Sequence, residues 1–224
     1  MTDHVQPLTG GPGAKAGGAV SGALKAGTAE DHHRTEKGDF QRRFASGRLS
    51  LELYVAWLEQ MLHVYRVLEA RLASLRTDER FSGFLDEELW RTPQLERDLR
   101  HFGRPAGQAP ALPATEALGR RFEEWAGRPA LVGGLYVLEG STNGSRFNAR
   151  VLRKAYRLAD GDGTAFLDPY GERQPEKWRA FKAALDTLPE ADVPALVTAA
   201  RATFVAIQEI GAELLERAGG QEPA

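Results

Sequence analysis

Apolar residues recur along this chain at alternating intervals of three and four, the spacing that places side chains on one face of an α-helix. The clearest run lies within residues 50–75. It comprises Leu51, Tyr54, Leu58, Met61, Tyr65, Leu68 and Leu72. Ser50 precedes the run and suits the N-cap, because its hydroxyl can accept a hydrogen bond from a free amide of the first turn. The pattern predicts a long helix with one buried face.

A second long stripe closes the chain and predicts another helix. It comprises Val193, Val197, Ala200, Phe204, Ile207, Gly211 and Leu214. Weaker patterns predict helices over 24–37, 85–101, 115–126 and 175–188. No alternating strand pattern extends beyond a few residues. The sequence therefore predicts an all-α fold, a single-domain helical bundle.

The ends of the chain differ from its middle. Residues 1–22 are rich in glycine and alanine without any hydrophobic period, so we expect a disordered tail. The folded domain is predicted over 23–218, followed by a short tail over 219–224. The longest apolar run, 130–138, is far shorter than the roughly 20 residues that a membrane span needs. We expect a cytoplasmic protein without a membrane partner.

Composition excludes several classes of function. The formal net charge is −2, which argues against non-specific nucleic-acid binding, because that needs a basic surface. The chain has no cysteine. Disulfides, thiolate metal sites, iron–sulfur clusters and cysteine nucleophiles are thereby excluded.

Two glycines four residues apart mark the middle of an expected helical stretch over 129–156. Gly140 and Gly144 enclose Ser141, Thr142 and Asn143. Each glycine inside a helix costs about 1 kcal/mol relative to alanine, so this segment should weaken and bend. One explanation is a large flat ligand lying directly against the backbone. A loop between two helices, or a tight helix crossing at the glycines, remains the alternative.

Two of the five histidines stand together in the first expected helix, as His32 and His33. A neutral imidazole can ligate a metal through one nitrogen while the other nitrogen donates to a nearby oxygen. Glu36 lies one helical turn after His32 and can supply that oxygen. Alternatively, both histidines belong to a solvated helix face.

These motifs in their order resemble the haem oxygenase family, in particular its bacterial, biliverdin-producing branch associated with phytochromes. Leu24 to Thr28, followed by His32 and Glu36, is similar to the segment that carries the iron ligand in that family. The Leu-Tyr-Val-Leu-Glu-Gly-Ser stretch over 135–141, with Gly144, resembles the helix on the opposite side of the haem. Tyr170-Gly171 and Trp178 match a later landmark. The resemblance covers about residues 23–215.

The resemblance implies that haem b is both cofactor and substrate. Haem would be cleaved with O2 to biliverdin, carbon monoxide and ferrous iron. His32 rather than His33 would ligate the iron, because Thr28 and Glu36 have the family spacing to it. Gly140, Asn143 and Gly144 would lie on the oxygen-binding side.

Further implications concern charge and partners. Lys182, then Arg179 and Lys177, are the basic residues expected to pair with a haem propionate. Electrons would come from a separate donor, a ferredoxin or a reductase, and a phytochrome is an implied partner.

Two residues depart from the family pattern. Asn143 and Ser145 stand where this branch has an apolar residue and a small glycine or alanine, and Ser145 is expected to crowd the oxygen site. One alternative is therefore a non-catalytic haem-binding or scaffold-only protein of the same fold. A di-iron oxidase is the other alternative, with Glu59 and His63 as candidate ligands four residues apart.

Overall fold

The computed structural model describes residues 18–105 and 107–219, and these ranges contain helices, turns and no strand. The all-α prediction is confirmed. The helices are α1 (Ala19–Gly27), α2 (Ala29–Lys37), α3 (Asp39–Ala45), α4 (Leu51–Leu72), α5 (Thr92–His101), α6 (Pro113–Glu124), α7 (Pro129–Tyr156), α8 (Gln174–Leu185) and α9 (Val193–Gly219). Short 3-10 turns connect several of them.

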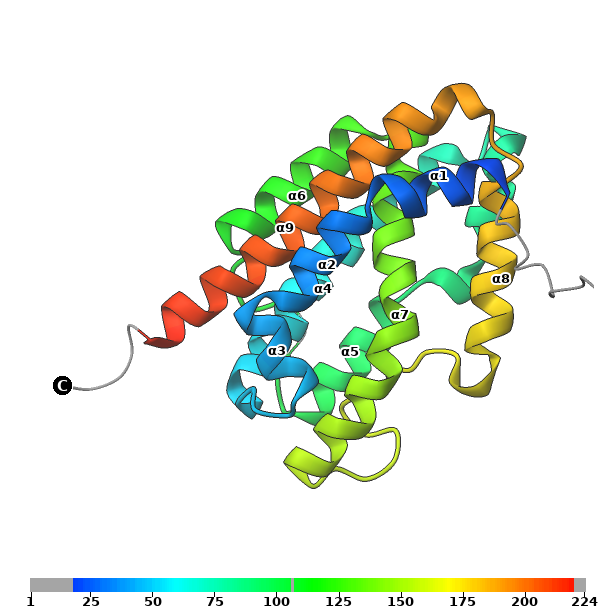
Figure 1. The fold of residues 1–224 in the computed structure, drawn as a ribbon. Helices are drawn as coiled ribbons and strands as arrows, with labels where there is room; N and C mark the ends of the chain where they lie inside the picture. The colour runs from blue at the N-terminus through cyan, green and yellow to red at the C-terminus, as the bar shows by residue number, and fades with distance from the viewer. Residues whose placement is uncertain (1–17, 106, 220–224) are drawn as a thin grey trace, which may run out of the picture.

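The last helix is the packing centre of the bundle. It makes its most extensive contact with α7, which crosses it, and also contacts α1, α2, α3, α4 and α6. In Figure 1, α1 and α2 run beside α9, while α7 passes between α3 and α8, both of which it contacts. By length and composition alone α9 could cross a membrane. Its buried residues, from Leu196 to Leu214, instead pack within the bundle, as in the core helix of a globular protein.

The stripe predicted over residues 50–75 forms α4, and its first turn is capped as expected. The Ser50 hydroxyl accepts a hydrogen bond from the Leu53 amide at 3.2 Å. Leu51, in the first turn, is 41% exposed, whereas the other six members of the stripe are buried. The periodicity therefore identified the buried face of α4, except that Leu51 at its first turn is exposed to solvent.

The N-terminal part of the domain differs from the expected single helix over 24–37. The helix is broken at Thr28, and α1 begins at Ala19, four residues before the predicted start of the domain. A distant contact explains the earlier start: the amide and hydroxyl of Ser21 donate to the Asp186 carboxylate at 2.8 and 3.0 Å. The rest of the predicted tail, residues 1–17, and residues 220–224 lie outside the described residues.

The closest helix crossing occurs at Gly133 in α7. A Cβ atom at this position would lie 2.3 Å from the Leu196 carbonyl oxygen of α9, so any larger residue would force the helices apart. A tight helix crossing was one explanation for Gly140 and Gly144. In α7 such a crossing with α9 lies at Gly133, two turns before Gly140.

Candidate functional site

One face of α7 is covered at its two ends and open between them. We call this the glycine face; its members, spaced 4, 4, 3 and 4 residues apart, are Tyr136, Gly140, Gly144, Phe147 and Val151. Trp178 of α8 covers Gly140, since a Cβ there would meet its ring at 3.3 Å. At the other end, the Val151 side chain lies 2.9 Å from the Cβ position of Gly47, between α3 and α4. The two covered positions are about 16 Å apart along the helix.

The middle of the glycine face carries no packed side chain. A Cβ atom on Gly144 would meet none of the described residues within 4 Å. One turn further, the Phe147 side chain is 62% exposed, a large apolar group with little covering it. The middle of this face can therefore receive a broad apolar ligand.

The α1–α2 junction lies across from the start of the glycine face. Burial raises the pKa of Tyr136, and a hydrogen bond with Thr28 at the junction opposes that shift. After α2, the chain approaches α7 again near Val151, through α3 and the turn that follows it. In the chain, α2 lies between these two approaches to α7, and it carries His32 one turn after Thr28.

The His32 side chain has two contacts that orient it. Its Nδ1 atom lies 3.7 Å from a Glu36 carboxylate oxygen, as the one-turn spacing predicts. Its ring packs edge-on against Phe204 of α9, with the ring centroids 5.8 Å apart. The side chain is 60% exposed, which leaves Nε2 accessible to a ligand. His33, next to it on α2, is also exposed and lies about 100° round the helix.

The segment between the two glycines remains helical. Three consecutive side chains donate to the carbonyl three residues earlier: Ser141 to Leu138 at 2.7 Å, Thr142 to Glu139 at 2.6 Å and Asn143 to Gly140 at 2.9 Å. The alternative of a loop between two helices is therefore wrong, because α7 is continuous over Pro129–Tyr156. These side chains satisfy carbonyls that a loosened helix would expose, and Asn143 is engaged with its own backbone.

Two further polar residues contribute to this part of α7. Gln174 of α8 donates to the Thr142 hydroxyl at 2.7 Å and to the Asn143 amide oxygen at 3.3 Å. The Ser145 hydroxyl donates to the Leu167 carbonyl at 2.8 Å. This bond directs the Ser145 hydroxyl to the segment that follows α7.

The three basic residues predicted to bind a propionate have different surroundings in α8. The Lys182 ammonium lies 6.0 Å from the ring centre of Trp178, the residue that covers Gly140. Lys177 forms an ion pair with Glu88. Arg179 is exposed. Only Lys182 is linked by a described contact to the glycine face.

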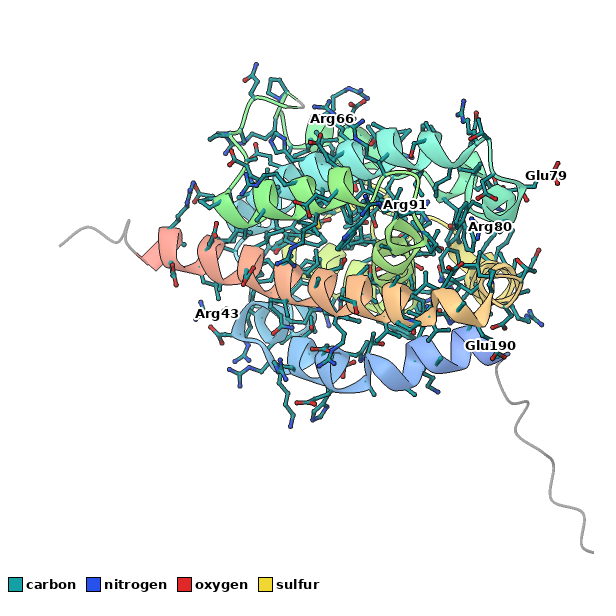
Figure 2. All side chains as sticks on the ribbon, turned by 90° about the horizontal axis from the view of Figure 1, so that it is seen from above. Arg43, Arg66, Glu79, Arg80, Arg91 and Glu190 are labelled. Carbon is teal, nitrogen blue, oxygen red and sulfur yellow. The ribbon has the colours of Figure 1, made fainter. Side chains whose placement is uncertain are left out.

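A buried ion pair lies directly behind the glycine face. The Arg91 guanidinium is fully buried, 2.8 Å from the carboxylate of Glu139, the residue before Gly140, and also donates to the Tyr170 hydroxyl. Figure 2 shows Arg91 inside the molecule, whereas Arg43 and Arg66 extend from its periphery. Burial raises the pKa of Glu139, and Arg91 opposes that shift. This pair ties α7 to the start of α5.

Several residues around the glycine face were not predicted as site residues. Tyr136 and Phe204 belong to apolar stretches that indicate only a core position. Phe147 carried a usable signal, because it is an aromatic residue at glycine-face spacing within the basic half of its helix. Arg91 and Glu139 are 48 residues apart in sequence, and no local pattern joins them.

Comparisons with known proteins agree with this arrangement. The family model described as heme oxygenase matches residues 19–213, which include both α2 and α7. The heme oxygenase 2 of Synechocystis sp. is 28% identical over 198 residues, covering 84% of this chain and 79% of that relative.

Solved structures have the same fold. That of heme oxygenase-2 from Synechocystis sp., in complex with heme and NO, has a TM-score of 0.83 at 24% identity, covering 90% of this chain and 87% of the other. That of the Leptospira interrogans heme oxygenase has a TM-score of 0.77 at 24% identity, covering 87% and 98%. The family match extends over most of the chain and includes both walls of the site. The chain therefore belongs to the haem oxygenase family.

Proposed function

We propose that this protein is a haem oxygenase, which binds haem b between His32 and the glycine face and cleaves it to biliverdin, carbon monoxide and ferrous iron. The observation that carries the proposal is Gly144. A glycine inside a helix costs about 1 kcal/mol relative to alanine, and no described residue occupies the place of its missing side chain. A flat ligand lying against the backbone accounts for this glycine.

His32 is proposed as the iron ligand, through Nε2. The Glu36 carboxylate, 3.7 Å from the opposite ring nitrogen Nδ1, would orient the ring and favour the tautomer with its proton on Nδ1. Phe204 supports the ring from α9. When bound, haem supplies the iron centre at which O2 binds and is reduced. His32 would hold the haem from α2, and α7 would border the side on which O2 binds.

The glycine face would form the other wall. Gly144 would let the backbone of α7 approach the porphyrin, Gly140 would lie at the edge of the site under Trp178, and Phe147 would cover the outer edge. Asn143 is proposed to act as a positioning residue, because its amide holds the Gly140 carbonyl.

Lys182 is the proposed partner of a propionate, ahead of Arg179 and Lys177. Lys177 already has a carboxylate partner in Glu88, and Arg179 has no described contact with the glycine face. A fixed positive charge would orient the asymmetric haem and so select the carbon bridge that is attacked.

The partners are also proposals. The described residues form one helical bundle, so we infer that electrons come from a separate donor, a ferredoxin or a reductase. We further propose a cytoplasmic location and a phytochrome that receives the biliverdin, on the basis of the sequence resemblance.

Replacing each of the paired histidines tests the ligand. We expect His32→Ala to abolish the Soret band of the axially ligated haem and the formation of a red-absorbing product with ascorbate or a ferredoxin system. His33→Ala, the matched control on the same helix, should leave both unchanged. The measurements are a haem titration followed by absorbance during turnover.

Other results would contradict the proposal. Loss of the Soret band in the His33 variant alone would show that His33, and not His32, is the iron ligand. Haem binding by the wild-type protein without a red-absorbing product would instead indicate a non-catalytic haem-binding protein.

Iron without porphyrin would indicate the di-iron alternative, although residues 18–105 and 107–219 hold no cluster of three or more metal-ligating side chains. His63 is held by the Ala109 carbonyl at 2.8 Å.

A further inference from the structure

The helix that carries His32 has no apolar face. Apart from Ala29, its residues are polar or charged, and its one buried side chain is that of Asp31. Breaks at Thr28 and Gly38 separate it from the neighbouring helices. A nine-residue helix is marginal in isolation, and hydrophobic burial contributes little to this one. Specific polar contacts must therefore set its orientation.

Two such contacts join α2 to α9. The Asp31 carboxylate is 3% exposed and lies 3.0 Å from Nε of Arg201. One turn further along α2 and two turns further along α9, Gln208 donates from Nε2 to the Thr35 hydroxyl at 2.8 Å. We call these four residues the polar latch.

The histidine contact lies between the two polar contacts. Phe204, which packs against the His32 ring, stands between Arg201 and Gln208 on the same face of α9. Rotation of α2 about its axis would turn the imidazole, and it would also break both contacts of the polar latch. It would leave the buried Asp31 carboxylate with only the more distant Arg34 guanidinium of its own helix, at 3.8 Å, and the loss of the closer partner is costly.

We propose that the polar latch fixes the direction of the His32 imidazole, with Asp31 and Arg201 as positioning residues for the iron ligand. This inference rests on the proposed function, because it assigns the latch a role toward a bound haem. The latch does not touch haem itself. It acts by preventing α2 from rotating and sliding over α9.

Neutralising one carboxylate tests the latch, with its neighbour as the matched control. Asp31→Asn removes the charge that pairs with Arg201. Glu30→Gln removes one carboxylate from the same helix, at an exposed residue that pairs with Arg34 and not with Arg201. In the haem-free protein, we expect amide hydrogen exchange in α2 to accelerate about tenfold in Asp31→Asn and to stay unchanged in Glu30→Gln. In the haem complex, the iron–histidine stretching frequency should shift and broaden only in Asp31→Asn.

Arg201→Gln provides a second, independent variant that removes the other partner of the same pair. It should reproduce both effects, and the double variant should add little to either single change, because the two residues act as a pair. Circular dichroism confirms that each variant retains its helices.

The outcomes separate this inference from the proposed function. Unchanged exchange in Asp31→Asn would overturn the latch. Faster exchange with an unchanged iron–histidine frequency would overturn its positioning role. Persistence of that frequency in His32→Ala would instead refute the proposed ligand, which is a different failure.

Discussion

At the scale of single residues, the two glycines Gly140 and Gly144 of α7 have different physical explanations. A Cβ on Gly140 would press on the Trp178 ring, so packing within the protein accounts for that glycine. Gly144 has the same helical conformation and no such neighbour among the described residues. Its cost to the helix is not offset by packing, which points to a ligand.

Gly144→Ala should therefore have opposite effects on stability and on haem binding. The free energy of unfolding of the haem-free protein should rise by about 0.5–1 kcal/mol, because alanine favours the helix and meets open space. Haem affinity and turnover should fall, since the methyl group would separate the backbone from the porphyrin. Urea unfolding and haem titration measure the two effects.

Gly119→Ala is the control for this prediction. Gly119 lies inside α6, where a Cβ would make an ordinary contact with Val67 at 3.7 Å. This change should also stabilise the protein but leave haem affinity unchanged. Equal loss of haem affinity in both variants would show that the Gly144 effect is not local.

At the scale of elements, α7 performs two tasks along one length. Its first turns pack tightly on α9 at Gly133, and from Tyr136 onward it presents the glycine face. The buried Arg91–Glu139 pair lies beside the start of that face and ties the helix to α5. The glycine face therefore extends from a well-anchored half of the helix.

Gly133→Ala tests that anchor. The methyl group would lie 2.3 Å from the Leu196 carbonyl oxygen, and backbone atoms cannot move aside cheaply. We expect the free energy of unfolding to fall by about 1–3 kcal/mol, with a lower Tm. An unchanged Tm would mean that α7 and α9 are less closely packed than described.

At the scale of the whole molecule, a buried carboxylate ties the segment after α7 to α5. Asp98 is fully buried and accepts hydrogen bonds from the amides of Ala165 and Phe166 at 2.9 and 2.8 Å. Burial raises its pKa to about 6, although these two hydrogen bonds oppose the shift. The segment holding Leu167, which fixes Ser145, depends on this contact.

The raised pKa predicts how stability depends on pH. The ordinary pKa of an aspartate is about 3.9, so between pH 4 and pH 6 the folded protein binds the Asp98 proton more tightly than the unfolded chain does. The contribution of Asp98 to stability is therefore greatest below pH 4 and declines as the pH rises to about 6. Measured across that range, the free energy of unfolding of the wild type minus that of Asp98→Asn should fall by on the order of 2 kcal/mol. A constant difference would contradict the pKa.

The sequence by itself determined the local features. Periodicity identified α4 with its buried face, and α9 with part of its buried face, since Val193, Val197 and Ile207 are only partly buried. Ser50 identified a cap, and the four-residue spacing of His32 and Glu36 predicted their contact. These features depend on residues within a few turns of each other, where helix geometry alone fixes which side chains meet.

Tertiary structure decided what joins distant segments. The early start of α1 depends on Asp186, the packing of α2 on Arg201 and Gln208, and the close crossing of α7 on Leu196. The difference between Gly140 and Gly144 depends on Trp178. Each of these partners lies far away in the sequence, and helical periodicity says which face of a helix is buried but not which residue covers it.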